Sequence, residues 1–295
     1  MPDQETVPDQ EITSDQEIMS GGVNTVVRVG DTVRRPTGPW SPRVHELLRR
    51  LREQGFTAAP AVHGVTEDGF ELLDFIPGEV SDYPATPAAA SAEALRSAAE
   101  VLRAYHDATA EYARSAAADG WMLPARTPVE VICHGDYAPH NCVLDGTRVI
   151  GVIDFDTAHP GPRLWDIAYA VHRWAPLTAP ANADGFGTAA EQARRARDFC
   201  DRYGLGAADR AELIDTVIAR LHALVAYMRA EAAAGSAAFA GHLADGHHLQ
   251  YLGDARYLDE ERAVFDRWLG PGDPGPAGPG GPAESRGPAP ADGRR

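Results

Sequence analysis

The chain has 295 residues, of which 44% are hydrophobic, and its formal net charge is −16. This composition is typical of a globular protein, and the excess of acidic residues disfavours binding to nucleic acid or to anionic membrane surfaces. No apolar run approaches the ~20 residues needed to cross a bilayer, and the first residues lack the features of a secretory signal, so a cytoplasmic location is expected. The three cysteines include no C-x-x-C pair, which disfavours a disulfide framework or a zinc site.

Both ends of the chain have compositions that predict disorder. Residues 1–19 are acidic, repeat the pattern PDQET, PDQEI, SDQEI and contain few large apolar groups, so burial cannot offset the entropy lost on ordering them. Residues 270–295 are dominated by Pro and Gly, without the strict period of collagen. The folded part is therefore predicted to lie between residues 20 and 269.

Residues 20–78 are predicted to form a small lobe built on a β-sheet. The Val- and Thr-rich stretch 23–34 is interrupted by a Gly-Asp pair, which is typical of a β-hairpin turn. Two further strands are predicted at 61–64 and 70–76, on either side of the turn-like sequence TEDG.

One amphipathic helix is predicted between these pairs of strands. In the segment SPRVHELLRRLREQG, Ser41 is a plausible N-cap and Gly55 a stop signal. Helical spacing places four apolar side chains on one face: Val44, Leu47, Leu48 and Leu51.

Residues 79–269 are predicted to form a larger, mainly helical lobe. Strong helix formers with helical spacing of apolar residues occur at 91–117, 189–203, 207–233 and about 254–269.

A second predicted hairpin interrupts these helices and carries polar residues at both of its ends. Its two apolar strands lie within residues 143–153 and flank an Asp-Gly pair, a strong turn signal. Because a tight hairpin folds its ends together, we expect Asn141, before the first strand, to lie near Asp154, after the second. Asp136, in the preceding loop, can join them.

These three side chains suit phosphoryl transfer. Carboxylate and amide oxygens form a hard-oxygen site of the kind that Mg²⁺ uses while leaving positions open for phosphate. The reaction also needs a separate carboxylate that accepts the proton of the attacking hydroxyl. We therefore predict Asp136 as the catalytic base, and Asn141 and Asp154 as the metal ligands. The alternative is that all three are ordinary turn and cap residues.

The stretch HGDYAPHN has the spacing H-x-D-x-x-x-x-N and is followed by IDFD, as in the catalytic and metal loops of protein kinases, with Gly135 where those kinases usually have Arg. Together with GPRLWDIAY, it resembles the aminoglycoside phosphotransferase and choline-kinase-like family over residues 20–269. The resemblance implies an α+β, bilobal protein-kinase-like fold with a small N-terminal antiparallel β lobe, one helix in that lobe, and a larger mainly α-helical C-terminal lobe. ATP and Mg²⁺ would bind between the lobes.

The resemblance also implies roles outside the hairpin. The hinge backbone around Asp74 to Ile76 would hold the adenine, and the stretch SGGVNTVVRV would cover the phosphates. Asp166 would brace the catalytic loop from behind, and His134 would pack within that loop.

The chain departs from the family pattern in its basic residues. The family's small lobe ordinarily carries a Lys that contacts phosphate, whereas all 27 basic residues of this chain are Arg. We predict Arg34 as the substitute, with Arg28 and Arg35 behind it, because guanidinium also binds phosphate. Glu46 lies well away from the apolar face of its helix and is interpreted as a solvated surface charge.

The expected acceptor is a hydroxyl of a small molecule that is aminoglycoside-, amino-alcohol- or sugar-like. The acidic balance is compatible with a cationic acceptor, although fold does not fix the substrate. Two alternatives remain open. One is a catalytically weak nucleotide-binding or scaffold protein, motivated by the missing Lys, and the other is a kinase that acts on a peptide hydroxyl.

Overall fold

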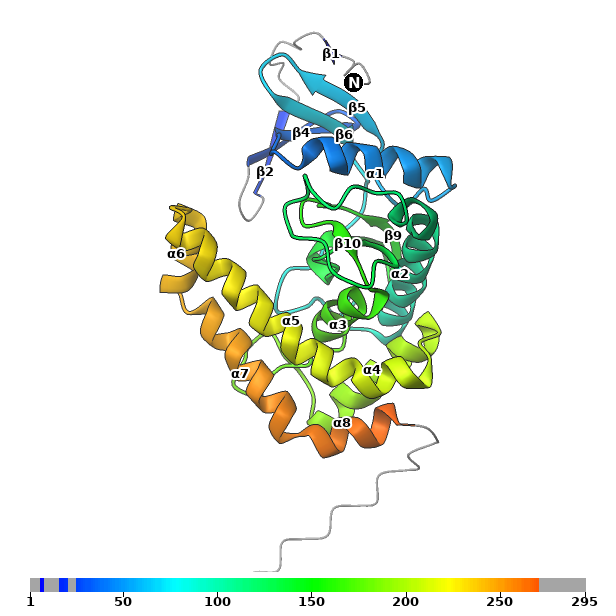
Figure 1. The fold of residues 1–295 in the computed structure, drawn as a ribbon, viewed down its shortest axis with the longest axis vertical. Helices are drawn as coiled ribbons and strands as arrows, with labels where there is room; N and C mark the ends of the chain where they lie inside the picture. Colours follow the sequence, from blue (N-terminus) through cyan, green and yellow to red (C-terminus); the bar gives the residue numbers. More distant parts are fainter. Residues whose placement is uncertain (1–5, 8–15, 21–24, 271–295) are drawn as a thin grey trace, which may run out of the picture.

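The computed structural model describes residues 6–7, 16–20 and 25–270. They form a small lobe of β-sheet with one helix and a larger lobe that is mainly helical (Figure 1). The bilobal α+β fold predicted from the sequence is confirmed.

The sheet of the small lobe has the strand order β1-β5-β6-β4-β3-β2. Neighbouring strands are antiparallel except for β1 and β5. Both predicted strand pairs are present, as β3–β4 and β5–β6. The strands are β1 (Thr6–Val7), β2 (Gln16–Ser20), β3 (Thr25–Val29), β4 (Thr32–Pro36), β5 (Val62–Thr66) and β6 (Phe70–Asp74).

Strands β1 and β2 fall in the segment predicted to be disordered. The backbone of β2 pairs with β3, and that of β1 pairs with β5. An edge strand offers unpaired backbone donors and acceptors, so a segment of little apolar character can still pair there. Residues 1–5 and 8–15 of the predicted tail, residues 21–24 of the predicted phosphate-covering stretch, and residues 271–295 lie outside the described part of the chain.

Helix α1 (Ser41–Glu53) packs its apolar face inward as predicted. The four apolar residues of that face are each at most 2% exposed, and burying such a side chain stabilises the fold by about 1.5–3 kcal/mol. The predicted N-cap is corrected: Trp40 is the N-cap, and Ser41 is the first helical residue. The hydroxyl of Ser41 accepts the N–H of Gly38, three residues earlier, instead of capping the helix.

The larger lobe contains seven helices within the described residues. The predictions at 91–117, 189–203 and 207–233 are confirmed, whereas 254–269 spans two helices that meet at Glu261. Helix α6 was not predicted because it buries no residue and so lacks an apolar face. The helices are α2 (Ala92–Ala113), α3 (Arg163–Trp174), α4 (Ala189–Tyr203), α5 (Ala207–Ala233), α6 (Ala237–Ala244), α7 (His247–Glu260) and α8 (Arg262–Leu269).

Two small antiparallel pairs lie in the larger lobe next to the small one (Figure 1). The predicted hairpin is β8 (Cys142–Asp145) with β9 (Arg148–Val152), and an additional pair is β7 (Val131–Cys133) with β10 (His159–Gly161). Each strand of the additional pair has three residues, too few to show a period in the sequence. No helix in the described ranges combines the length and the apolar character that crossing a membrane requires.

Candidate active site

The predicted catalytic loop connects β7 to the 3₁₀ helix η1 (Pro139–Asn141) and depends on one glycine. Gly135 has a φ of +85°, and a Cβ atom added there would lie 2.4 Å from the carbonyl oxygen of Thr157. A side chain at this position would be strained and would also overlap the neighbouring backbone. The Arg of the protein-kinase pattern therefore cannot occupy this position in this chain.

The buried carboxylate of Asp166, in the first turn of α3, holds this loop from behind. It accepts the backbone N–H of His134 at 2.7 Å and that of Gly135 at 2.9 Å, and it contacts the ring of His106 at 3.0 Å. Burial raises the pKa of Asp166, but the bond with His106 and the charges and donors around it lower the pKa to about 2. The bracing contacts implied by the family resemblance are therefore present.

Asp136 is held by side chains on several sides and still reaches solvent. The amide Nδ2 of Asn141 donates to its Oδ2 and to its main-chain oxygen, both at 2.9 Å. The Nε2 atom of His140 lies 3.4 Å from the same Oδ2, and the nearby side chain of Tyr169 also favours the ionised carboxylate. Burial raises the pKa of Asp136, but these bonds lower it overall. An ionised carboxylate that is 31% exposed can accept a proton from a bound hydroxyl.

The β8–β9 hairpin brings Asn141 and Asp154 to the same end, as predicted. Cys142 pairs with Val152 across the hairpin, and the N–H of Ile153 donates to the carbonyl oxygen of Asn141 at 3.0 Å. Asp154 follows directly, with a φ of +60° that is uncommon for a residue other than Gly. Its side chain is 49% exposed.

A guanidinium from the small lobe contacts this end of the hairpin. Arg35, on β4, donates from Nη1 to Oδ1 of Asp154 at 3.0 Å and from Nη2 to Oδ1 of Asp156 at 2.5 Å. Its Nε donates to Oε1 of Glu71, on the neighbouring strand β6, at 2.5 Å. Burial and the nearby Asp154 raise the pKa of Asp156, although Arg35 opposes the shift. Arg35 thus links the two lobes beside the proposed metal ligands.

The structure does not bring Arg34, the predicted substitute for the missing Lys, to this cluster. Its guanidinium pairs with Asp68 and lies over the ring of Phe70 at 4.1 Å. Successive residues of a strand point to opposite faces, so Arg35 shares its face with Val33, which packs against the core. This alternation in the sequence favours Arg35 over Arg34 as the arginine that faces the cluster.

A buried carboxylate that the sequence did not single out balances Arg35. Glu71 is 1% exposed and contacts both Arg35 and His45 of α1. Burial raises the pKa of Glu71, but its bond with His45 and the charge of Arg35 lower it overall. Glu71 lies two positions before the buried Leu73, so both side chains are on the same face of β6. This alternation could have identified Glu71 from the sequence. Glu46 is 39% exposed, in agreement with its interpretation as a solvated residue.

The predicted hinge follows β6, where the chain passes to the larger lobe. The carboxylate of Asp74 accepts the N–H of Ala61 at 3.0 Å and lies 2.6 Å from the ring of His63. Ile76 packs close to Gly151 of β9, and its N–H makes no hydrogen bond to another described residue. The side chain of Asp74 is therefore engaged within the sheet. The N–H groups of Asp74 and Phe75 are also bonded, to the carbonyl oxygens of Ala61 at 3.0 Å and Asp31 at 2.8 Å, so Ile76 is the residue of this segment whose N–H has no partner among the described residues.

The residues at the end of the hairpin fit a divalent cation by the chemistry of their donors. Asn141 uses its Nδ2 for Asp136, and its Oδ1 accepts no hydrogen bond within the described residues. Asp154 presents a half-exposed carboxylate beside it. An amide oxygen and a carboxylate are ligands that Mg²⁺ accepts together with phosphate oxygens and water. Within the described ranges, no three His, Cys, Asp or Glu side chains form a metal-binding group.

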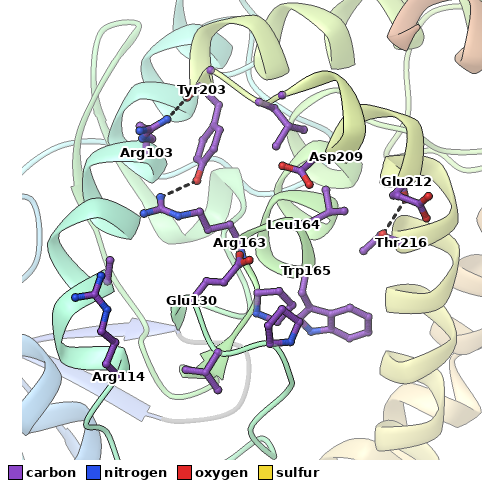
Figure 2. Close-up of a pocket in the computed structure, with 17 residues that line it drawn as sticks. Arg103, Arg114, Glu130, Arg163, Leu164, Trp165, Tyr203, Asp209, Glu212 and Thr216 are labelled. Carbon is purple, nitrogen blue, oxygen red and sulfur yellow. Dashed lines mark hydrogen bonds between the residues drawn. The ribbon is translucent and has the colours of Figure 1, made fainter.

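A surface pocket of about 830 Å³ in the larger lobe is separate from these residues (Figure 2). None of the predicted site residues lines it, although its wall is connected to the catalytic loop. Arg163 donates to the hydroxyl of Tyr203 at 3.1 Å, and that hydroxyl lies 2.7 Å from the ring of His106, which contacts Asp166. The pocket wall therefore belongs to the network that supports the loop.

The site residues lie within a recognisable family match. A model of the phosphotransferase enzyme family, APH, matches residues 16–129 and 111–213. The chain belongs to this family. The trifolitoxin immunity protein of Rhizobium leguminosarum bv. trifolii is similar to this chain at 36% identity over 209 residues, which are 67% of this chain and 77% of the relative.

Solved structures share the fold of this chain at low sequence identity. An ethanolamine kinase of Plasmodium vivax has a TM-score of 0.61 at 13% identity and covers 85% of this chain and 84% of its own. An amicoumacin kinase in complex with AMP-PNP and Ca²⁺ has a TM-score of 0.57 at 13% identity, with 88% and 90% covered. A choline/ethanolamine kinase family protein from Mesorhizobium loti has a TM-score of 0.54 at 16% identity, with 87% and 92% covered. These likenesses show the fold alone.

Proposed function

We propose that this protein transfers the γ-phosphate of ATP to a hydroxyl group of a small molecule. The observation that carries the proposal is the position of Asp136. It is an ionised, partly exposed carboxylate on a braced loop, hydrogen-bonded to Asn141 at the end of the hairpin that also presents Asp154. A proton acceptor and hard-oxygen ligands next to each other are what phosphoryl transfer requires.

In this mechanism Asp136 orients the acceptor hydroxyl and takes its proton. The acceptor oxygen forms a bond to the γ-phosphorus, the bond from that phosphorus to the β-phosphate oxygen breaks, and ADP leaves. The hydrogen bond from Asn141 holds the carboxylate of Asp136 in one orientation, so little reorganisation is needed when the hydroxyl binds.

Binding of the nucleotide is assigned to the space between the lobes. Arg35 would contact phosphate oxygens, with Glu71 and His45 holding its guanidinium in place. The backbone between Asp74 and Ile76 would face the adenine. Asn141 and Asp154 would hold Mg²⁺, which neutralises phosphate charge when it is bound.

Aminoglycoside-, amino-alcohol- and sugar-like compounds are the acceptor classes to test first. The structures that share the fold include an ethanolamine kinase and an amicoumacin kinase, which supports a small hydroxylated molecule. Because ATP is a cytoplasmic substrate, the proposal retains the cytoplasmic location expected from the sequence.

A catalytically weak nucleotide-binding or scaffold protein is the rival. It is motivated by the absence of Lys from the sequence and by the contacts that tie Arg35 to Asp154 and Asp156. The experiment measures Mg²⁺-dependent ATP binding and acceptor-dependent ADP release separately. Release of ADP with at least one acceptor supports the phosphotransferase, whereas binding without release across a broad acceptor panel supports the scaffold.

The 36% identity to an immunity protein favours a second candidate function, protection of a cell against a toxin. Phosphorylation of the toxin, including a hydroxyl of a peptide, would use the same site. Expression of the wild-type chain and of Asp136→Asn in a susceptible strain tests it. Protection by the wild type alone indicates phosphorylation, protection by both indicates binding without chemistry, and protection by neither rejects this candidate.

A further inference from the structure

Beside the proposed base lies an arginine that the mechanism above does not use. Arg173 is on α3, four residues after Tyr169, so the two side chains share one face of the helix. Tyr169 lies close enough to Asp136 for each to shift the pKa of the other, so this face of α3 is near the catalytic loop. Arg173 is therefore on the acceptor side of the site. Its role, as inferred here, rests on the function proposed above.

The guanidinium of Arg173 is buried but has few polar partners. It lies 3.8 Å from the ring centre of Tyr83, and its Nε donates to the hydroxyl of Tyr83 at 3.0 Å. The carboxylate of Asp184 is 3.8 Å from Nη2, too far for a direct hydrogen bond. Neither Nη atom makes a hydrogen bond to another described residue. Most of the donors of this guanidinium therefore remain available to a ligand.

The surroundings place Arg173 close to where the acceptor must bind. The ring of Tyr83 lies 5.9 Å from that of His140, and Nε2 of His140 is 3.4 Å from Oδ2 of Asp136. Burial raises the pKa of the Tyr83 hydroxyl well beyond its usual range, so this phenol is neutral and cannot balance the cation. Among the described residues, the carboxylate of Asp184 forms an ion pair with Arg173 at 3.8 Å, without a direct hydrogen bond.

This arrangement discriminates between classes of acceptor. An ammonium group would have to approach a guanidinium that already covers the face of Tyr83, the kind of aromatic surface that attracts cations. A carboxylate, in contrast, matches the planar fork of a guanidinium and can accept two of its hydrogen bonds.

We propose that the acceptor carries a carboxylate, bound by Arg173, on the same molecule as the hydroxyl that Asp136 deprotonates. The net charge of the chain is compatible with a cationic acceptor, whereas this proposal gives the acceptor an anionic group, because the charge next to Arg173 differs from that of the chain as a whole. Arg173 is then a residue that determines specificity, and Tyr83 orients it.

The experiment uses ω-hydroxy acids of increasing chain length and the amino alcohols that match them in length. Acceptor-dependent ADP release gives kcat/KM for each compound with the wild type, Arg173→Gln and Arg173→Lys. The wild type is expected to favour the acids, and Arg173→Gln is expected to lower kcat/KM for the acids by about 10- to 100-fold while the amino alcohols change about twofold at most. Arg173→Lys, which retains the charge, is expected to restore part of the loss.

Arg195 supplies a matched control for a purely structural role. Its guanidinium is also part-buried, but it donates to the carbonyl oxygens of Ala90 and Trp174. Arg195→Gln is expected to lower thermal stability without changing the ratio of kcat/KM between acids and amino alcohols. If Arg173→Gln behaves in the same way, lowering both classes equally, Arg173 is structural and the proposal is overturned.

Binding measured by calorimetry separates this proposal from the proposed function. Phosphorylation of amino alcohols in preference to acids overturns the carboxylate assignment and leaves the phosphotransferase intact. Arg173-dependent binding of the hydroxy acids without any ADP release supports the carboxylate site and contradicts the proposed function. A wild type that binds none of the hydroxy acids overturns the carboxylate site.

Discussion

The N–H of Ile153 donates to the carbonyl oxygen of Asn141 at 3.0 Å and closes the open end of the β8–β9 hairpin. Asp154 follows Ile153 directly, so this backbone bond sets Asp154 beside Asn141. Because this bond joins backbone atoms, a change of the Asn141 side chain leaves it in place. The effect of such a change on metal binding can therefore be separated from an effect on the hairpin.

Replacement of Asn141 by Ala is therefore expected to weaken Mg²⁺-dependent nucleotide binding without opening the hairpin. The variant loses a proposed metal ligand, and loss of a contact at a metal site commonly costs about 10- to 100-fold in affinity. ATP affinity measured over a range of Mg²⁺ concentrations checks the prediction. Asp145→Ala, at the exposed turn of the same hairpin, is the control and should behave as the wild type. An unchanged Mg²⁺ dependence in Asn141→Ala would remove Asn141 from the metal site.

Adjacent arginines on β4 give a matched pair of variants. Arg35→Ala is expected to lower the free energy of unfolding by about 3 kcal/mol or more, because it leaves the buried Glu71 without its guanidinium partner. Arg35→Lys keeps the positive charge and should fold. Its ATP affinity then shows how much the guanidinium contributes to phosphate binding. Arg34→Ala should change stability and ATP affinity much less, since its pair with Asp68 is exposed. Denaturant unfolding and calorimetric ATP titration compare the three, and a larger loss of affinity in Arg34→Ala than in Arg35→Lys would restore the original assignment of Arg34.

Two glycines with positive φ differ in what surrounds them. Gly135→Ala meets the carbonyl oxygen of Thr157 at 2.4 Å, so it should displace the catalytic loop and abolish transfer. Gly146→Ala, at the hairpin turn, has a φ of +60° but open space around the added Cβ, so only the cost of the backbone conformation remains, about 1 kcal/mol. Equal rates of ADP release in the two variants would show that the close contact at Gly135 does not position the loop.

Buried histidines should make the fold sensitive to mild acid. Burial lowers the pKa of His159 to about 4, against about 6.5 in an unfolded chain. The folded state thus favours the neutral ring, and the stability present above pH 6.5 is lost as the pH falls through the folded pKa. For this residue alone the loss between pH 7 and 5 is roughly 2 kcal/mol. Denaturant unfolding at the two pH values measures it, and His159→Asn should flatten the dependence. If the free energy of unfolding of His159→Asn falls as much between pH 7 and 5 as that of the wild type, the acid sensitivity comes from other groups.

The sequence predicted which site residues are neighbours wherever a short stretch of chain determines their positions. A tight hairpin brings its two ends together, so Asn141 and Asp154 could be placed near each other from the chain alone. The predicted Asp145-Gly146 turn is corrected by one position: Asp145 pairs with Arg148 in the hairpin, the turn is at residues 146–147, and a register shift between Val143 and Leu144 changes the pairing toward the site. Asp166 could be assigned its supporting position because the family motif carries it. In both cases the decisive information lies within a short stretch of sequence.

The arginine cluster depended on contacts between distant segments, which the sequence does not specify. The alternation of side chains along β4 favours Arg35 over Arg34, but only the structure shows that this face of the strand turns toward Asp154 and Asp156. Glu71 was missed because its partners Arg35 and His45 come from two other elements. Arg173 could not be singled out either, since Tyr83 reaches it from the segment that joins the lobes.

Single-turnover transfer of the γ-phosphate by Asp136→Asn is the measurement that tests the central claim most directly. Asn keeps the shape of the side chain but cannot take the proton of the acceptor, so the rate should fall by about 100-fold or more while ATP affinity stays within about threefold of the wild type. A variant that binds ATP and transfers phosphate at the wild-type rate would contradict the assignment of Asp136 as the base, and with it the mechanism proposed for this fold.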